Sequence, residues 1–328
     1  MGAASQVLHT LHAARPRWFD LCMGKLVLVT GAAGFIGSHL CDGLLAAGLR
    51  VRGADNLSFG SRDNLRQALA HPAFELVEAE LKDASACASA CEGVSAVLHH
   101  AARVGVPDSL RDPDACRRDT LTTTENLLRA AGTAGVQRFV LASTAAVYGD
   151  AACPVREDAA TSPLSPYGEF KLAAEAALRE SGLDGVSLRY FNVYGARQSP
   201  SSPYASVVTL FVDGLRRNEP VTVYGDGHQR RDFLHVSDVV RANLAALRCA
   251  ERLGGRSVNI GSGVGVSMLE LAALLGRALG REASVQHKPP RPGDIRESWA
   301  DTALAQSVLG FKVQRRLAEG LRELLEVS

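Results

Sequence analysis

The sequence lacks a long hydrophobic run and lacks an excess of charge of either sign. None of its apolar stretches approaches the ~18 residues that a membrane-spanning helix requires, because glycine or a charged residue interrupts each one. Lysine and arginine number 36 against 35 acidic residues, so the formal net charge of the 328-residue chain is +1. This balance gives no reason to expect binding to nucleic acid or to a membrane. Any anionic ligand must be held by a few local groups.

The chain also lacks a paired cysteine pattern. Its seven cysteines are scattered and odd in number, which argues against a disulfide framework and for a reducing compartment, the cytoplasm. Cys87 and Cys91 lie four residues apart but have no second pair of ligands nearby, whereas a zinc site needs four clustered ligands. We therefore expect no metal site.

Residues 1–22 differ in character from the rest of the chain. They contain two histidines and two arginines but only one acidic residue, and Met23 then opens a segment that reads like a natural start. We interpret them as an N-terminal extension, a cloning remnant or a misassigned start. The scarcity of acids leaves a transit peptide open, although the low serine content argues against it.

From Lys25 onward, short β-branched runs alternate with longer stretches rich in alanine and leucine. Strands are predicted at 26–30, 49–55, 74–80, 95–101, 136–144 and 186–195, with helices at 35–47, 125–135 and 169–182 between them. Because buried parallel strands read as near-continuous apolar runs, this alternation predicts an α/β fold with a doubly wound parallel sheet.

The character of the sequence changes after Gly195. A Ser/Pro-rich stretch is followed by a predicted helix at 207–218. We assign residues 23–195 to a first domain, to which the chain returns at about 230–262. Residues 196–328 then form mainly a smaller C-terminal lobe that binds the substrate. Two amphipathic helices, at 268–280 and 315–327, are predicted within that lobe.

A glycine-rich turn follows the first predicted strand directly. The segment GAAGFIG places Gly31, Gly34 and Gly37 three residues apart where a helix begins. Such a turn lets backbone N–H groups approach a pyrophosphate, and the helix N-terminus adds partial positive charge. Asp55 ends the second strand about twenty residues later, where a carboxylate can bind the adenosine ribose. This pattern predicts a dinucleotide site and favours NAD, although Arg62 leaves NADP open.

A tyrosine and a lysine share one face of a predicted helix. Tyr167 and Lys171 lie four residues apart in YGEFK. A nearby ammonium favours phenolate over phenol, so we expect Lys171 to move the pKa of Tyr167 from near 10 toward the working pH. Ser143 and Thr144 end the strand at 136–144, at the edge of the sheet where ligands of such folds bind.

Eight motifs follow one another along the chain: GAAGFIGSHL, DNLSFG, VLHHAA, LASTAAVYG, YGEFK, RYFNVYG, RRDFLHVSDV and RPGDIRESWAD. In this order they resemble the extended short-chain dehydrogenase/reductases, and within them the nucleotide-sugar epimerases and dehydratases. The resemblance implies a Rossmann fold, bound NAD, a UDP-sugar substrate and a homodimer packed through the helix that bears Tyr167 and Lys171.

The resemblance also assigns roles to individual residues. Thr144 matches the catalytic Ser/Thr before a VYG turn, Tyr167 the catalytic base, and Lys171 its partner, which also binds the nicotinamide ribose. The further cofactor contacts are Gly31, Gly34, Phe35, Ile36, Gly37, Asp55, Asn56, Ser58, Gly60, Glu80, Leu81, Ala101, Ala102, Ser143 and Tyr190. The positions at the UDP-sugar are Phe191, Asn192, Val207, Tyr224, Arg231, Arg291, Asp294 and Ser298. His235 is expected to be structural.

Two alanines bear on the type of reaction. Dehydratases of this family usually carry Asp-Glu directly after the catalytic Thr, because elimination needs an acid and a base beyond the Tyr. Here Ala145 and Ala146 occupy these positions and cannot transfer protons. We therefore predict a 4-epimerase that interconverts UDP-hexoses through a 4-keto intermediate. A nucleotide-sugar dehydratase or a UDP-glucuronate epimerase is the alternative, and a non-enzymatic NAD-binding scaffold would be expected to lack Tyr167 or Lys171.

The sugar is suggested by the residue before the WAD element. In the family a Tyr there tends to exclude N-acetyl groups and a small residue admits them, so Ser298 predicts that UDP-GlcNAc and UDP-GalNAc are accepted, alone or alongside UDP-Glc and UDP-Gal. Thr120 and Thr123 stand where the family commonly has Asn and Gly. These departures leave a different hexose, a uronate or a pentose open.

Overall fold

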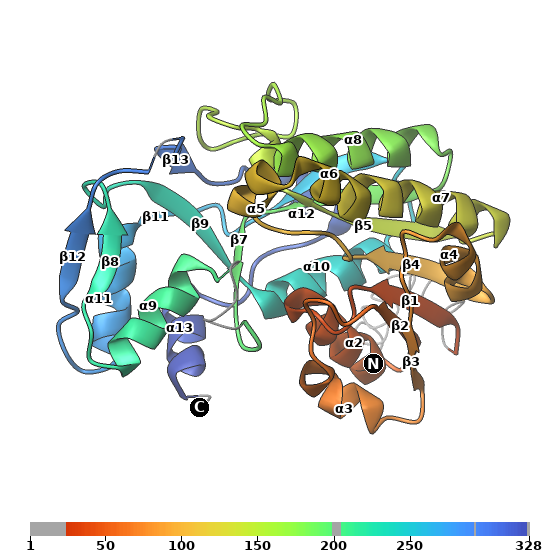
Figure 1. Ribbon diagram of the computed structural model, residues 1–328, viewed down its shortest axis with the longest axis horizontal. Coiled ribbons are helices and arrows are strands. Elements are labelled where there is room, and N and C mark those ends of the chain that lie inside the picture. Colours follow the sequence, from red (N-terminus) through yellow and green to blue (C-terminus); the bar gives the residue numbers. More distant parts are fainter. Residues whose placement is uncertain (1–23, 199–204, 292, 327–328) are drawn as a thin grey trace, which may run out of the picture.

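The structure, a computed structural model, describes residues 24–198, 205–291 and 293–326. Residues 1–22, which we interpret as an extension, lie outside the described residues, as does most of the Ser/Pro-rich stretch. Figure 1 shows two lobes side by side, a larger one that contains most of the chain and a smaller one that contains the C-terminal end.

The larger lobe is built on one parallel sheet of seven strands. Their order is β10-β6-β5-β4-β1-β2-β3, and all neighbours pair in parallel. The strands are β1 (Leu26–Thr30), β2 (Arg50–Asp55), β3 (Phe74–Glu78), β4 (Val94–His99), β5 (Arg138–Thr144), β6 (Gly185–Tyr190) and β10 (Arg256–Ile260). The strand order reverses between β1 and β4, which opens a crevice at the carboxyl ends of these two strands.

Helices cover both faces of this sheet, as Figure 1 shows. One face carries α2 (Phe35–Ala46), the short turns η1 (Arg62–Leu65) and α3 (Arg66–Leu69), α10 (Val236–Arg248) and α12 (Ala303–Leu309). The other face carries α4 (Ala84–Cys91), α7 (Thr123–Thr133) and α8 (Pro166–Glu180). Two short helices and a π-helical turn precede α7: α5 (Val106–Arg111), α6 (Pro113–Arg117) and η2 (Arg118–Thr122).

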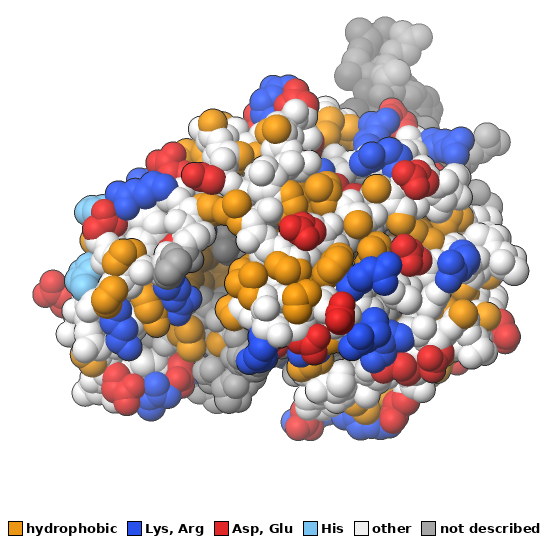
Figure 2. Space-filling view, turned by 45° about the horizontal axis from the view of Figure 1, so that its top comes forward, with side chains coloured by type: hydrophobic (Ala, Val, Ile, Leu, Met, Phe, Trp, Pro, Cys, Tyr) orange, Lys and Arg blue, Asp and Glu red, His pale blue; other side chains and the backbone are white. Residues whose placement is uncertain are grey.

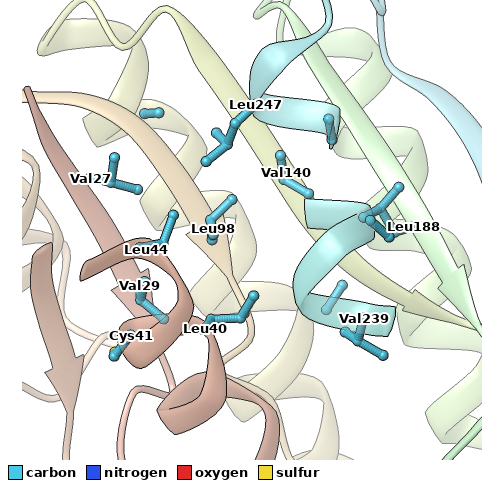
Figure 3. Close-up of a cluster of buried hydrophobic side chains, with 14 of the residues drawn as sticks. Val27, Val29, Leu40, Cys41, Leu44, Leu98, Val140, Leu188, Val239 and Leu247 are labelled. Atoms are coloured by element: carbon cyan, nitrogen blue, oxygen red, sulfur yellow. The ribbon is translucent and has the colours of Figure 1, made fainter. Parts of the chain in front are cut away.

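The first of these layers holds the largest core. Figure 3 shows Leu40 and Leu44 of α2 and Val239 of α10 packed against the strand residues Val29 and Leu98. All five are at most 1% exposed. Burying side chains of this size on both faces of the sheet fixes the carboxyl ends of its strands in space, and these ends carry the candidate site.

The smaller lobe combines short strands with three helices. Strands β8 (Val221–Tyr224) and β12 (Val285–Lys288) pair in parallel, and β9 (Arg230–His235) pairs with β7 (Asn192–Tyr194), β11 (Gly265–Ser267) and β13 (Glu297–Ser298). The helices are α9 (Val207–Arg216), α11 (Met268–Ala278) and α13 (Leu317–Glu326). Their apolar faces meet around Phe211, Leu271 and Leu321.

The predicted α/β architecture with a doubly wound parallel sheet is confirmed. The two lobes do not follow the order of the chain: α10, β10 and α12 lie with the larger lobe although they come after the first strands of the smaller one. The helix α12 was not predicted. No helix in the described part of the chain is long and apolar enough to cross a membrane. Within the same residues, no cluster of His, Cys, Asp or Glu could hold a metal ion.

Candidate functional site

The glycine-rich turn between β1 and α2 forms a cradle that larger residues would fill. Gly31 has φ +66°, and a Cβ there would lie 2.9 Å from the backbone nitrogen of Ala101. A Cβ on Gly37 would overlap the carbonyl oxygen of Gly31. The N-cap of α2 is Gly34, so no side chain caps this helix. The cradle and the uncapped N-terminus fit the pyrophosphate of a dinucleotide.

Asp55 connects this cradle to the loop after β2. Its carboxylate accepts hydrogen bonds from the backbone nitrogens of Ala33 at 2.9 Å and Leu57 at 2.8 Å. The loop packs closely, since a Cβ on Gly60 would lie 2.7 Å from the carbonyl carbon of Ala33. The structure therefore holds Asp55 beside the glycine turn, where a carboxylate meets the adenosine ribose.

The predicted cofactor residues that follow β2 and β3 also bond to one another. The side-chain amide of Asn56 donates to Glu80 at 3.0 Å. Both the backbone nitrogen and the hydroxyl of Ser58 donate to the side-chain oxygen Oδ1 of Asn56. Arg62, the residue that leaves NADP open, is paired with Glu78.

Two predicted cofactor residues have side chains in the hydrophobic core. Leu81 is 4% exposed and packs with α4 and α7, and Ile36 packs against the core under α2. Phe35 is partly buried, and its ring meets His39 edge to face at 5.8 Å between centroids. Contacts from Leu81 to a cofactor would therefore come from backbone atoms.

A buried histidine fixes the loop after β4. The hydroxyl of Thr30 pairs with His99 Nδ1 at 2.7 Å and accepts from the backbone nitrogens of His100 and Ala101, each at 3.1 Å. The other ring nitrogen of His99 pairs with Thr124 at 3.0 Å. Burial holds the pKa of His99 well below its usual range, so the ring is neutral. This arrangement places Ala101 against Gly31 and was not predicted.

Tyr190 is held by a second unpredicted pair. Asn243 of α10 donates to the Tyr190 hydroxyl at 2.8 Å, and His100 Nε2 lies 3.1 Å from the same oxygen. The His100 and Tyr190 rings stack with centroids 5.9 Å apart. Burial, helped by the charge of Lys171, lowers the pKa of His100 to about 3. The only sequence signal for His100 is its place in the VLHHAA motif.

The structure brings the three predicted catalytic residues together. Thr144 ends β5, while Tyr167 and Lys171 lie in the first two turns of α8. This helix begins at Pro166 because the Ser165 side chain accepts from the backbone nitrogen of Gly168 at 3.3 Å. Lys171 Nζ donates to the carbonyl oxygen of Ala142 at 2.9 Å. The side chains of Thr144 and Tyr167 are joined by a hydrogen bond.

The predicted lowering of the Tyr167 pKa by Lys171 does not occur in this structure. Burial raises the pKa of Tyr167 to about 12, and the hydrogen bond with Thr144 opposes the shift only in part. Burial likewise lowers the pKa of Lys171 to about 8, and the charge of Glu175 opposes this shift only in part. The reason is that both side chains are removed from water, which disfavours the charged form of each.

The side chain of Ser143 also differs from expectation. Its hydroxyl donates to the buried carboxylate of Glu175. Successive residues of a strand point to opposite faces, so Ser143 is directed into the protein when Thr144 faces the site. Thr120 and Thr123, the two departures from the family pattern, are also buried, at 1% and 3% exposure.

The substrate candidates fall into two groups in the smaller lobe. Arg231 of β9 forms an ion pair with Asp294, and Ser298 of β13 lies beside Arg231 in the register of the two strands. The guanidinium of Arg291 lies over the Tyr224 ring, 3.8 Å from its centroid. Figure 2 shows the surface hollowed between the two lobes.

The other predicted residues have these places. Asn192 is exposed and donates to the carbonyl oxygen of Asp232 at 3.1 Å, while Phe191 is 3% exposed. Val207 opens α9 and packs against the core of the smaller lobe. His235 caps α10 by accepting from the backbone nitrogen of Ser237 at 3.3 Å, a structural role as expected.

The known proteins that resemble this chain do so over nearly its whole length. Residues 27–261 match the model of the NAD dependent epimerase/dehydratase family. The chain is 39% identical over 306 residues to UDP-glucose 4-epimerase of Mycolicibacterium smegmatis, which covers 91% of this chain and 97% of that protein. It resembles the solved UDP-N-acetylglucosamine 4-epimerase of Methanobrevibacter ruminantium in complex with UDP-N-acetylmuramic acid, at a TM-score of 0.87, 32% identity and coverage of 92% and 97%. It also resembles UDP-glucuronic acid 4-epimerase of Bacillus cereus with UDP-glucuronic acid and NAD, at a TM-score of 0.86, 30% identity and coverage of 92% and 98%.

Proposed function

Because the chain belongs to the NAD dependent epimerase/dehydratase family, we propose that it is a UDP-sugar 4-epimerase that works with tightly bound NAD. The observation that carries this proposal is the group formed by Thr144, Tyr167 and Lys171 at the carboxyl end of β5, with only β4 between β5 and the strand that leads into the glycine cradle. This group can move a proton at a sugar hydroxyl, and Ala145 and Ala146 beside it add no further acid or base.

The residues of the crevice fit NAD. The cradle between Gly31 and Gly37 receives the pyrophosphate, Asp55 accepts from the adenosine ribose, and Lys171 donates to the nicotinamide ribose. When bound, NAD supplies the hydride acceptor of the first half-reaction and the hydride donor of the second. Its positive charge also favours the phenolate form of Tyr167.

Tyr167 acts as the base and then as the acid. In the oxidation, its oxygen takes the proton of the sugar 4-hydroxyl while hydride leaves C4, which produces the 4-keto sugar. In the reduction, Tyr167 returns the proton to the 4-oxygen as hydride returns to the opposite face. Thr144 hydrogen-bonds the same sugar oxygen, so the reacting hydroxyl is held in place. No net oxidation results.

The inversion requires an anchor that stays fixed while the sugar turns. A nucleoside diphosphate carries about two negative charges, and guanidinium groups match its oxygens in a bidentate way. Arg231 and Arg291 serve this role in the proposal. The ion pair between Arg231 and Asp294 opens when the diphosphate takes the place of the carboxylate, which frees Asp294 for the ribose.

Dehydration is disfavoured by the surroundings of Lys171. Elimination of water needs an acid and a base beyond Tyr167, and the two positions after Thr144 carry only methyl groups. The carboxylate that interacts with Lys171 is Glu175, whose oxygens are occupied by Arg189, Ser143 and Ser257. A carboxylate bound in this way cannot carry protons to and from a substrate.

We propose that Ser298 admits N-acetylated sugars. Its side chain is small and 9% exposed, and it lies beside the diphosphate-binding Arg231. A larger side chain there would extend toward the sugar. The substrates are therefore UDP-GlcNAc and UDP-GalNAc, alone or together with UDP-Glc and UDP-Gal.

One experiment tests both the reaction class and the sugar. The purified protein is incubated separately with UDP-Glc, UDP-GlcNAc, UDP-GlcA and dTDP-Glc, and the products are resolved by chromatography and NMR. The proposal expects a mixture of two 4-epimers without added cofactor. A 4-keto-6-deoxy product would show a dehydratase instead, and epimerisation of UDP-GlcA alone would show a uronate enzyme.

We further propose a homodimer packed through α8 and α7. Figure 2 shows hydrophobic side chains on the face of the larger lobe that α5 to α8 form. Val106 and Leu110 of α5 are 41% and 61% exposed, and Leu164 in the loop before α8 is 58% exposed. A second copy would cover this apolar face. Light scattering at micromolar concentration should give the mass of a dimer.

A reducing compartment such as the cytoplasm fits the thiols. The six cysteines in the described part of the chain are all free, and Cys41, Cys87, Cys91 and Cys116 are buried. Burial raises the pKa of each of these four thiols, so they stay protonated and unreactive.

A further inference from the structure

A buried carboxylate lies one helical turn beyond Lys171. Glu175 of α8 is 0% exposed, and its two oxygens accept four hydrogen bonds. Arg189 of β6 donates two of them, at 2.9 and 2.6 Å. The hydroxyl of Ser257 of β10 donates the third at 2.8 Å, and the hydroxyl of Ser143 of β5 donates the fourth. All three partner residues therefore lie on strands of the central sheet.

These bonds tie the catalytic helix to the strand that carries Thr144. Glu175 bonds to Ser143, and Lys171 bonds to the carbonyl oxygen of Ala142, so α8 is attached to β5 at two successive residues. Thr144 follows directly. Its position relative to Lys171 is thus set by the two residues before it.

The same network holds the turn after Thr144. Arg189 donates to the hydroxyl of Tyr148 at 2.8 Å, and that hydroxyl donates to Asn259 at 2.6 Å. Tyr148 caps the C-terminal end of the short 3₁₀ turn η3 (Ala145–Val147). Thr144 therefore lies between two anchors, and the Glu175–Arg189 pair connects them.

The charge of Glu175 also acts on Lys171. The titratable groups around Lys171 are Tyr167 and Glu175 on its own helix, Cys116 on α6, and His99 and His100 at the end of β4. Burial keeps the two histidines neutral and the thiol protonated. Glu175 is the carboxylate of this group, and its charge favours the ammonium form of Lys171.

We propose that Glu175 is a positioning residue for the epimerase reaction: through Ser143 it fixes Thr144 against Tyr167, and through its charge it keeps Lys171 protonated. This role rests on the proposed function. Glu175 touches neither substrate nor cofactor, so its loss should change the chemical step and leave the NAD content and the KM for the UDP-sugar unchanged.

A matched pair of serine variants tests the geometric part. Ser143→Ala and Ser257→Ala each remove one hydroxyl bond to Glu175 and keep the ion pair with Arg189. The expected result is at least a fivefold loss of kcat for Ser143→Ala, with KM and bound NAD within twofold of the wild type. Ser257→Ala should keep kcat within twofold. Equal kcat for the two variants, or loss of NAD from Ser143→Ala, would overturn the proposal.

The electrostatic part is tested by Glu175→Gln. Without the carboxylate, the pKa of Lys171 falls further, so the pH at which kcat stops rising should move down by about one unit. If Glu175→Gln does not fold, the serine pair above decides the proposal. An unshifted pH profile in the folded Glu175→Gln variant would overturn the proposal. An inactive wild type would instead refute the proposed function.

Discussion

Lys171 Nζ lies 2.9 Å from the carbonyl oxygen of Ala142, two residues before Thr144 on the neighbouring strand. The amine of α8 is thus held by the backbone of β5. Because this bond needs no cofactor and no substrate, the spacing of α8 from β5 is set by the folded protein itself.

The pH dependence of the rate follows from Tyr167 and Lys171. The pKa of Tyr167 is raised to about 12, so the fraction of phenolate increases as the pH rises from 6 to 8. Above the Lys171 pKa of about 8, loss of the ammonium offsets further gain of phenolate. We expect kcat to rise with pH and to flatten near pH 8, measured from initial rates of epimer formation.

Lys171→Met provides the control for this profile. Without the amine, the residual rate should keep rising above pH 8, because only Tyr167 titrates. A wild-type rate that falls between pH 6 and pH 8 would contradict the assigned roles.

Replacing the base should separate catalysis from cofactor binding. Tyr167→Phe removes the oxygen that exchanges a proton with the sugar, so turnover should fall by about 10³-fold or more. The NAD released on denaturation, measured by absorbance and chromatography, should remain at the wild-type level. A variant purified without NAD would mean that Tyr167 serves mainly to hold the cofactor.

The cradle can be closed by one methyl group. In Gly37→Ala the new Cβ overlaps the carbonyl oxygen of Gly31, so the turn must shift. We expect loss of bound NAD and a decrease of about 1–3 kcal/mol in the free energy of unfolding. In Gly132→Ala no atom lies within 4 Å of the new Cβ, and α7 should gain about 0.5–1 kcal/mol. Equal NAD content in the two variants would refute the proposed role of the cradle in binding the pyrophosphate of NAD.

Enlarging residue 298 should narrow the range of sugars. Ser298→Tyr is expected to lower kcat/KM for UDP-GlcNAc by about tenfold or more, because the ring occupies the space of the N-acetyl group. Activity on UDP-Glc, where the wild type has it, should persist, and Ser298→Ala should behave as the wild type. Undiminished turnover of UDP-GlcNAc by Ser298→Tyr would disprove the gating role.

Weakening the proposed diphosphate anchor should lower the affinity for the UDP-sugar. Arg231→Lys keeps a positive charge but loses the bidentate fork, so we expect KM for the UDP-sugar to rise about tenfold or more. Arg296→Lys is the matched control, because the side chain of Arg296 bonds only to Asp226 among the contacts described and both side chains are exposed. A similar KM for the two variants would remove Arg231 from the site.

Much of the fold follows from local patterns in the sequence. The strand 26–30 is an uninterrupted apolar run and matches β1 residue for residue, and the predicted helix 35–47 differs from α2 by one residue. The start of α8 was placed three residues late, because the Ser165 cap and the tolerated Pro166 lie outside the alanine-rich stretch.

The site could be predicted where sequence spacing implies proximity. Tyr167 and Lys171 are one turn apart on any helix, and the glycine turn is continuous in the chain. His100 and Asn243 could not be found in this way, because β4 and α10 meet at Tyr190 only after the sheet has formed. The predicted lowering of the Tyr167 pKa was wrong for a related reason, since the burial that raises this pKa depends on the whole fold.

The way the chain passes between the lobes limits how this protein can be divided. It leaves the large sheet after β6, comes back for α10 and β10, leaves again for β11, and contributes α12 to the large lobe before it ends in the small one. No single cut can release the smaller lobe as one continuous fragment. An engineer who wishes to exchange that part for one from a relative must transplant several separate segments at once, and the same constraint favours stepwise substitution at single positions over recombination of whole lobes.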